Sequence, residues 1–492
     1  MLAAAHAIDA CAGSPPAGGW GRALNRTIPL ILAVALFMEN MDSTVIATSL
    51  PAIAADIGAS PITLKLALTS YFVALAIFIP VSGWMADRYG AKRVFRAAIG
   101  VFVVGSIACA AASSLPEFVG ARFVQGMGGA MMTPVGRLVL VRATPRAQLV
   151  QAMAWLTVPA LIGPLVGPPV GGFITTYFSW HWIFLINVPI GLVGIWLAGR
   201  VLPEIEAVSP GRLDVVGFVL AGIAAAGVVF GLSVISMPAL PVLVGPATLA
   251  LGIAAGLAYV RHARVTVRPL LDFSILSNQA VRVAVVSGSL FRIGVGAVPF
   301  LLPLMFQLAF GLTPFESGML TFASAFGAIA MKFVATTALR LAGFRSVLIA
   351  ASLMGSALIA SNGLFRPDTP YAIIIAVLIG AGLMRSLYFT CVNALVFAEI
   401  ENDQAGQATA ISAVAQQISI ALGVAVAGLI LETHAAVTGE PVGLSAFVMA
   451  FPIVGALTAL AVIPLLPLPP GTGSAVSGHG SRQAAMRPEI AE

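Results

Sequence analysis

The sequence predicts an all-α membrane protein with many spanning helices, and three observations support this fold class. Of the 492 residues, 59% are hydrophobic and only 9% are charged, whereas a soluble domain averages about 25% charged residues. A chain of this length cannot hide so much apolar surface in soluble cores. The apolar residues also fall into runs of about 20, the length that crosses a bilayer as a helix. The composition therefore excludes a soluble enzyme and a protein that binds nucleic acid, and the lipid bilayer is the expected surrounding.

Fourteen apolar runs are long enough to be transmembrane helices, and glycine and proline inside them are tolerated because neighbouring helices cover the freed backbone groups. The N-terminal segment has no signal-peptide pattern, so the first span is expected to remain as an anchor. The expected spans lie at 28–50, 64–84, 95–114, 117–140, 151–176, 182–200, 215–235, 240–260, 283–308, 316–338, 345–364, 371–397, 406–431 and 444–466.

The distribution of the 25 lysines and arginines supports this count. When both termini are placed in the cytoplasm, nineteen basic residues fall on the cytoplasmic side or at inner helix ends, and Lys65 and Arg366 fall in outer loops. This bias is the one that orients membrane proteins. Four arginines remain within spans: Arg122, Arg137, Arg292 and Arg385.

A weak internal repeat divides the chain into two halves. Pro116, Gly126 and Gly128 recur 254 residues later as Pro370, Gly380 and Gly382, and two other residue sets recur at offsets of 253 and 256. Spans 1–6 therefore match spans 9–14. We expect a cytoplasmic N-terminal tail (1–27), a six-helix half (28–200), two linker helices with cytoplasmic loops (201–282), a second six-helix half (283–466) and a disordered cytoplasmic tail (467–492). Two such halves around a midplane site are typical of alternating-access transporters.

The loop between the second and third spans reads GWMADRYGAKRVF and starts at Gly83. Gly83 and Gly90 allow close helix approach and a tight turn. Asp87 can cap the next helix or pair with an arginine, while Arg88 and Arg93 hold the loop on the inner side. The simpler interpretation is a basic inner loop with a turn, without a further role.

The fifth span contains TVPALIGPLVGPPVGGF. Gly163, Gly167 and Gly171 recur every four residues and so line one helix face, which lets a neighbouring helix approach closely. Pro164 and Pro168 kink or stiffen the helix. The structural alternative is an ordinary packing seam of small residues.

Three charges in the first and fourth spans are candidates for proton coupling. Glu39 and Asp42 are three residues apart and share one face, and a low-dielectric site favours the protonated form of such carboxylates. Arg122 is a functional candidate because a charge inside a span is costly, although it could instead extend to the outer surface. Asp42 and Arg122 lie at similar depths, roughly 12 and 8 Å from the outer ends of their spans. They could therefore interact directly or through water, which would help Asp42 release a proton.

Other polar residues are candidates for lining a cavity. Gln125 and Asn393 could face a cavity or make interhelical hydrogen bonds, and both interpretations stay open. Arg292 lies at nearly the depth of Glu39 in the symmetry-related span, so we expect these two side chains to approach each other, directly or through one water, in an occluded or inward-facing state. Arg385 adds a further deep cation. These charges predict a preference for neutral, zwitterionic or anionic substrates over lipophilic cations.

Several of these motifs resemble those of the major facilitator superfamily. The loop at Gly83 is similar to its signature loop, although the second copy carries Arg340 in place of Asp. The fifth span is similar to the antiporter motif of its exporters, and ARFVQGMGGAMM, around Arg122, to its fourth-helix motif. MDSTVIATSLPAIA and SWHWIFLINVPIG are similar to motifs of its fourteen-helix drug:proton antiporter branch, the EmrB/QacA-type multidrug exporters, with His181 where an arginine is common.

The resemblance implies a major facilitator fold and proton-driven export of hydrophobic or amphipathic small molecules across the inner (cytoplasmic) membrane. It implies no cofactor, with protons as the coupling ion, and proton-coupling roles for Asp42, Glu39 and Arg122. It also implies a cytoplasmic latch between the halves at Asp87, Arg88 and Arg93. The antiporter motif would comprise Gly163, Pro164, Gly167, Pro168, Gly171 and Gly172. A periplasmic adaptor protein is a conceivable partner, and the oligomeric state stays open.

Two alternatives stay open at this point: an exporter of one specific metabolite, and a non-transporting sensor on a transporter scaffold. An enzyme is disfavoured because no nucleophile–base pair occurs among the spans. The scattered cysteines and histidines give no metal-ligand spacing. No phosphate-binding loop is present either, so ATP is not expected to supply the energy.

Overall fold

The computed structural model describes residues 20–145, 148–204, 211–235, 237, 240–400, 404–469 and 471–477. Across this part of the chain the structure consists of helices joined by turns and loops, without any β-strand. The expected all-α class is therefore confirmed. Residues 1–19 of the expected N-terminal tail and 478–492 of the expected C-terminal tail lie outside the described residues.

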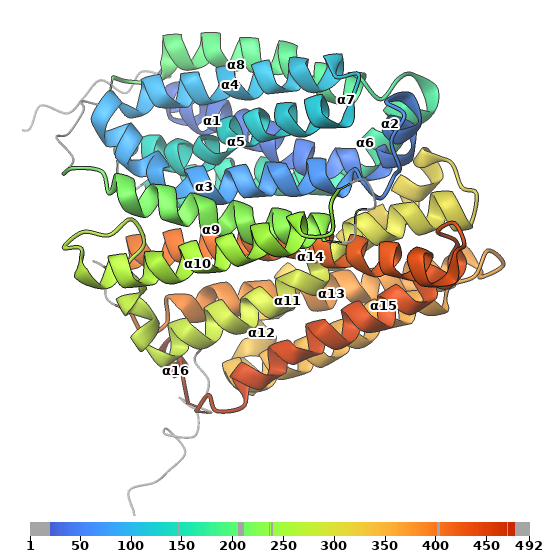
Figure 1. The fold of residues 1–492 in the computed structure, drawn as a ribbon. Helices are drawn as coiled ribbons and strands as arrows, with labels where there is room; N and C mark the ends of the chain where they lie inside the picture. Colours follow the sequence, from blue (N-terminus) through green and yellow to red (C-terminus); the bar gives the residue numbers. More distant parts are fainter. Residues whose placement is uncertain are drawn as a thin grey trace, which may run out of the picture.

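The N-terminal half is a bundle of six long helices and two short ones (Figure 1). The first helix begins at Trp20, ahead of the expected start at residue 28. The helices are α1 (Trp20–Val45), α2 (Leu50–Asp56), α3 (Lys65–Tyr89), α4 (Ala91–Ala111), α5 (Leu115–Ala143), α6 (Leu149–Tyr177), α7 (Trp182–Leu185) and α8 (Asn187–Val201).

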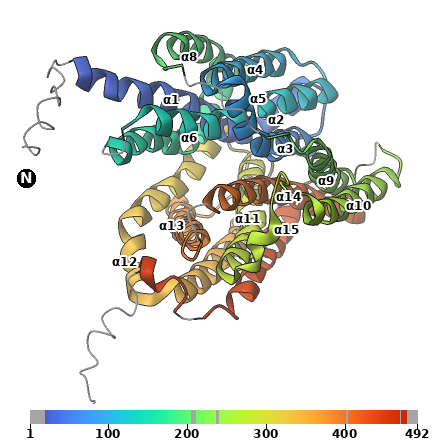
Figure 2. The ribbon, with the colours of Figure 1, turned by 90° about the vertical axis from the view of Figure 1, so that its left-hand side faces the viewer.

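Two linker helices, α9 (Val215–Val234) and α10 (Val244–Val265), pack along one side of the molecule. Gly227 and Gly252 let them approach so closely that a Cβ on either glycine would overlap the backbone of the other helix. Figure 2 shows α9 beside both α3 and α14. The inserted pair therefore covers the boundary between the halves.

The C-terminal half lies below the N-terminal half in Figure 1. Its helices are α11 (Gln279–Leu304), α12 (Pro314–Ser361), α13 (Tyr371–Val396), α14 (Ala405–Thr438) and α15 (Leu444–Ala459). A short helix, α16 (Ser474–Ser477), lies in the segment that was expected to be a disordered tail. Gly343 adopts φ +71° inside α12 and so divides this 48-residue helix into two passes. Gly90, the equivalent residue of the first half, adopts φ +89° between α3 and α4. The shared glycine turn supports the repeat.

The described helices provide fourteen passes. Twelve segments have the length and hydropathy of a membrane span, and one of these, Pro314–Leu364, contains both passes on either side of Gly343. Helix α5 supplies the remaining pass, with 29 residues that include four charged side chains: Glu117, Arg122, Arg137 and Arg142. The number of spans predicted from the sequence is therefore confirmed.

The two halves are joined at one end of the bundle. Three hydrogen bonds, one of them also an ion pair, join described residues of the two halves at the end where α3 begins, opposite the Gly90 turn. Gln307 Nε2 donates to the Thr48 carbonyl oxygen at 3.0 Å, and Phe315 N donates to Thr176 Oγ1 at 3.0 Å. One hydrophobic core cluster spans both halves at this end, and a small cluster of Val73, Val229 and Ala421 joins α3, α9 and α14. The structure is thus closed at this end.

Candidate functional site

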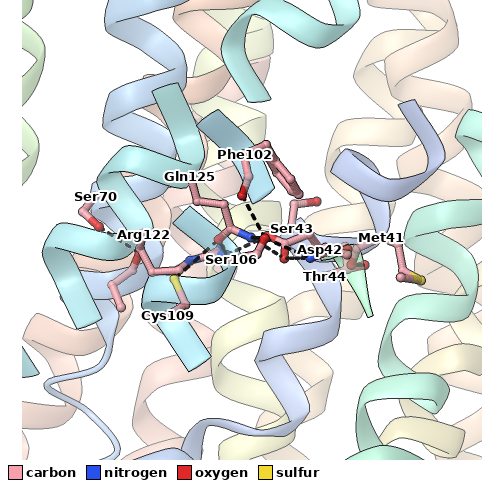
Figure 3. Close-up of polar contacts among 12 residues, drawn as sticks. Met41, Asp42, Ser43, Thr44, Ser70, Phe102, Ser106, Cys109, Arg122 and Gln125 are labelled. Atoms are coloured by element: carbon pink, nitrogen blue, oxygen red, sulfur yellow. Dashed lines mark hydrogen bonds and ion pairs between the residues drawn. The ribbon is translucent and has the colours of Figure 1, made fainter. Parts of the chain in front are cut away.

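Asp42 of α1 and Arg122 of α5 form a buried ion pair (Figure 3). Arg122 Nη1 donates to Asp42 Oδ2 at 2.6 Å, and both residues are fully buried. The interaction expected from their similar depths is therefore confirmed. The alternative in which Arg122 extends to the outer surface is wrong, because the protein interior encloses its guanidinium group.

Further polar groups from three helices surround this ion pair. Gln125 Nε2 donates to Asp42 Oδ1 and to Ser106 Oγ, both at 2.8 Å, while Gln125 Oε1 accepts from Arg122. Asn187 Nδ2, at the start of α8, donates to Asp42 Oδ1 at 2.9 Å. Asp42 therefore accepts hydrogen bonds from three donors, which hold its carboxylate in one position. Gln125 takes the interhelical role, not the cavity-lining one.

The sequence analysis missed Asn187 and Ser106 as members of this network. Asn187 lies 145 residues from Asp42 along the chain, so only the packing of α8 against α1 and α4 brings them together. Its signal was an isolated amide in an apolar stretch, within SWHWIFLINVPIG. Tyr71 was missed as well, and its ring lies 4.3 Å from the Arg122 guanidinium carbon. This cation–π contact stabilises the Arg122 guanidinium group without a second counter-charge.

Glu39 lies beside this network and closer to the surface. Its Oε2 accepts from Thr133 Oγ1 at 2.8 Å, and 9% of the residue is exposed. The Tyr71 hydroxyl and Glu39 Cγ lie within 3.4 Å of the position that a Cβ on Gly129 would occupy. Tyr71 thus stands between Arg122 and Glu39. Two carboxylates on one helix, one paired with arginine and one with a hydroxyl, form an arrangement that can bind and release a proton.

The expected approach of Glu39 and Arg292 does not occur in this structure. Arg292 Nη2 instead donates to Asn393 Oδ1 at 3.1 Å, and its guanidinium carbon lies 4.9 Å from the Phe389 ring centre. Glu39 accepts from a neutral side chain of its own half, and Arg292 donates to a neutral side chain of its own half.

The loop between α3 and α4 forms the predicted tight turn at Gly90. Asp87 Oδ1 accepts from Arg142 Nη2 at 2.7 Å, which confirms that it pairs with an arginine. This pair connects α3 and α5 within one half, so it is not a latch between the halves in this structure. Arg88 and Arg93 are exposed and form no ion pair with any described residue. The close helix approach predicted at Gly83 is wrong, because a Cβ there would meet open space.

The glycine face of α6 allows the predicted close helix approach, and the neighbouring helix is α1. A Cβ on Gly163 would lie 2.8 Å from the Phe37 carbonyl oxygen, and one on Gly167 would overlap the Thr44 side chain. Gly171 faces the Val45 carbonyl oxygen in the same way. Helix α6 stays continuous through its prolines, including Pro164 and Pro168. The glycine face therefore keeps α6 in close contact with α1, the helix that carries both candidate carboxylates.

Gly172 contacts a different helix. A Cβ on this residue would overlap the Pro314 carbonyl oxygen at the start of α12. Gly318 of α12 meets the Pro168 carbonyl oxygen in the same manner. Helix α6 therefore bridges α1 and the C-terminal half.

Fourteen helical passes in two related halves, with a buried charge network in one of them, define a multi-pass membrane transporter. The sequence matches the family model of the Major Facilitator Superfamily at residues 32–260 and 284–491. The chain belongs to this superfamily. Its members are transporters and not enzymes.

Relatives and solved structures agree with this assignment. The chain is 34% identical to the "Putative multidrug resistance protein MdtD" of Serratia proteamaculans, over 90% of this chain and 96% of that protein. It is 35% identical to the "Probable transport protein HsrA" of Haemophilus influenzae, over 83% and 88% of the two chains. The fold is similar to that of a POT family transporter in complex with 5-aminolevulinic acid, with a TM-score of 0.68, 15% identity and coverage of 91% and 96%. A D-xylose-proton symporter gives a TM-score of 0.65 at 16% identity, with coverage of 91% and 98%.

Proposed function

We propose that this protein is a proton-driven exporter of hydrophobic or amphipathic small molecules in the inner membrane. The observation that carries the proposal is the buried Asp42–Arg122 pair, with its donors Gln125 and Asn187. A charged network at this depth is costly and marks a functional site. The name of the MdtD relative supports export of drug-like compounds.

The proposed transport cycle uses the two-half architecture. The basic loops favour a cytoplasmic position for the Gly90 end. The hydrogen bonds at the opposite end then belong to an inward-facing state. Opening the other side requires these contacts to break while new ones form at the Gly90 end.

Protonation of Asp42 is the proposed trigger. A neutral Asp42 attracts Arg122 less strongly, so the position of α1 relative to α5 changes. Because α1 packs on the glycine face of α6, and α6 contacts α12 at Gly172, the change reaches the interface between the halves. Protons entering down their gradient would thus drive the export of substrate.

Transport by purified protein in vesicles tests the proposal. Fluorescent dyes and drugs of several classes are offered with and without an imposed pH gradient, and proton movement is followed with a pH-sensitive dye. We expect substrate movement against the direction of proton flow and only when the gradient is present. Gradient-independent movement, or none for any compound, would contradict proton-driven export.

A further inference from the structure

Three basic side chains of the C-terminal half lie away from the helix ends and from the Gly343 turn, and no acidic side chain lies near them. Arg292 lies midway along α11, Arg385 midway along α13, and Lys332 in the first pass of α12. Helices α11–α15 contain only two acidic residues, Glu316 and Glu432. Glu316 caps the start of α12 and Glu432 pairs at the closed end, so both are engaged far from these cations.

Two of the cations meet one stretch of α13. Lys332 Nζ donates to Thr390 Oγ1 at 3.1 Å, and Arg292 Nη2 donates to Asn393 Oδ1 at 3.1 Å. Thr390 and Asn393 are three residues apart and so share a helix face. Lys332 is exposed, and its ammonium group lies beside α13.

Arg385 belongs to the same face of α13. Arg385, Phe389 and Asn393 recur every four residues and form a row along one face of the helix. The Arg292 guanidinium carbon lies 4.9 Å from the Phe389 ring centre, which places Arg292 beside this row. The opposite face of α13, around Cys391, is fully buried in the core of the half.

The row of Arg385, Phe389 and Asn393 lies on an accessible face of α13. Figure 2 shows α13 in the interior of the bundle, with α12 along one side and α11 along the other. Arg385 and Phe389 are half-buried and Asn393 is exposed. Charges that faced lipid hydrocarbon here would be very costly. A water-accessible space inside the bundle is therefore the environment that these side chains occupy.

Three cations lack a counter-charge within the described part of the chain: Arg292, Lys332 and Arg385. Arg385 makes no hydrogen bond or ion pair there, and Arg292 and Lys332 each contact one neutral side chain. In the other half, Arg122 already neutralises Asp42, and Glu39 is held by Thr133. Arg292 is buried, and a buried charge in a protein is normally paired or binds a ligand of opposite charge. The missing negative charge is therefore one that a ligand can supply.

We propose that Arg292, Lys332 and Arg385, here named the basic stripe, bind the carboxylate of an organic anion whose apolar body packs against Phe389. A guanidinium group fits a carboxylate with two parallel hydrogen bonds. A lipophilic cation would instead meet three like charges. The inference rests on the proposed function, because it assigns the substrate class of the same transporter.

Equilibrium binding of two matched probes tests the basic stripe. 1-Pyrenebutyrate and 1-pyrenebutylamine have the same apolar body and opposite charge. Binding to purified protein in phosphatidylcholine nanodiscs is followed by pyrene fluorescence at pH 7 without a pH gradient. We expect pyrenebutyrate to bind at least about tenfold more tightly than pyrenebutylamine, the difference typical of one charge-assisted hydrogen-bonded pair.

Variants assign this preference to the basic stripe. Arg385→Gln and Arg292→Gln should each lower the affinity ratio by about tenfold, whereas Arg385→Lys should keep most of it. Arg200→Gln removes an exposed arginine at the end of α8 and should leave the ratio unchanged. Because Arg385 has no described partner, Arg385→Gln should unfold at the same temperature as the native protein or higher, which separates loss of binding from loss of fold.

Three results would overturn the proposal. They are equal affinity for the two probes, an unchanged ratio in both glutamine variants, and displacement of pyrenebutyrate by added phosphatidylglycerol. The last result would assign the basic stripe to a lipid headgroup. Binding is measured without a gradient, so the binding experiment can contradict the anion site while gradient-driven transport persists. Conversely, the anion site can be confirmed even if no gradient-driven transport is found.

Discussion

Lys65 of α3 and Glu432 of α14 form an ion pair that joins the two halves, with 2.6 Å between Nζ and Oε2. Lys65 is fully buried, and the Glu432 side chain is 11% exposed. Gly428 leaves room for the pair, because a Cβ there would overlap the aliphatic part of Lys65. The sequence analysis placed Lys65 in an outer loop, but α3 begins at this residue and turns it inward.

Lys65→Met should weaken closure of this end. The substitution keeps the aliphatic volume but removes the cation that faces a buried carboxylate, which costs on the order of 3 kcal/mol. Only the closed state contains the pair, so the population should shift toward states that are open at this end. Spin labels at exposed positions 55 and 440, one in each half, should report longer distances when they are measured by double electron–electron resonance.

Two matched variants accompany this experiment. Lys92 also pairs with a glutamate, Glu204, but at the opposite end of the bundle, where the Glu204 side chain is 74% exposed. Lys92→Met should therefore leave the distances unchanged. The exchange of Lys65 and Glu432 for each other should restore part of the closed population. Identical distance distributions in Lys65→Met and the native protein would contradict a closing role for the pair.

Asp42→Asn should abolish proton-coupled export while the protein still inserts and folds. The side chains have the same shape, so the packing around Arg122 and Gln125 is kept, but the amide does not take up and release a proton. Asn187→Ala should have a smaller effect, because it removes one of three donors to Asp42 at a cost of roughly 1–3 kcal/mol. Proton flux and dye transport in the same vesicles measure both variants. Full coupled transport by Asp42→Asn would rule out its role.

The number of spans, the repeat and the Asp42–Arg122 pair could be predicted from the sequence because each depends on local signals. Span length follows from hydropathy, and helix rise converts residue position into depth. The glycine face of α6 likewise follows from its four-residue spacing. The span count, the repeat and the glycine face need no knowledge of which helices are neighbours, whereas the Asp42–Arg122 pair also depends on placing both helices in one half.

The remaining site contacts depend on packing between distant helices. Asn187 reaches Asp42 only because α8 covers α1, and Lys65 meets Glu432 only because α3 lies beside α14. Depth alone suggested that Glu39 and Arg292 pair, but equal depth does not bring two helices together. Hydropathy also says little about whether a charge at a helix end turns inward or outward.

Gly167→Ala should destabilise the contact between α1 and α6. The added methyl group would overlap the Thr44 side chain and lie 3.2 Å from the Val45 backbone nitrogen. Overpacking of this kind typically costs about 1–3 kcal/mol. Gly120→Ala in α5 is the matched control, because its Cβ would meet open space, and it should be neutral or slightly stabilising. Thermal unfolding of the two variants compares them directly, and equal unfolding temperatures would argue against a tight seam.

Asp87→Ala should change the balance between the two access states without unfolding the protein. The Asp87–Arg142 pair is about one-third exposed on each side, so its loss should cost at most about 1 kcal/mol. If the effect acts through the link between α3 and α5, Arg142→Ala should reproduce it. The spin-label distances between positions 55 and 440 provide the measurement. Opposite shifts in the two variants would show that the pair is not the cause.

Asp214 should make the linker helices sensitive to acid. Its carboxylate caps α9 by accepting from Gly217 N at 2.8 Å, accepts from Leu270 N at 3.2 Å, and contacts His262 Nε2 of α10 at 2.7 Å. Burial alone would raise its pKa, but these hydrogen bonds and His262 outweigh burial and hold the pKa of Asp214 below its ordinary value of 3.8. Because the folded-state pKa is depressed, the ionised carboxylate stabilises the fold above pH 3.8, and this contribution is lost as the pH falls through the lower folded-state value.

Asp214→Asn isolates this charge, since asparagine is also a good N-cap. At pH 7 the variant should unfold at a lower temperature than the native protein, by the equivalent of about 1 kcal/mol or less. The difference in unfolding temperature should stay constant down to about pH 5 and shrink as the pH falls below 3.8. Below that pH the native carboxyl becomes protonated and is then neutral, like the asparagine of the variant. Asp368→Asn, at an exposed loop position, is the control and should show no difference at any pH. A gap between Asp214→Asn and the native protein that widens toward pH 3 would contradict the depressed pKa.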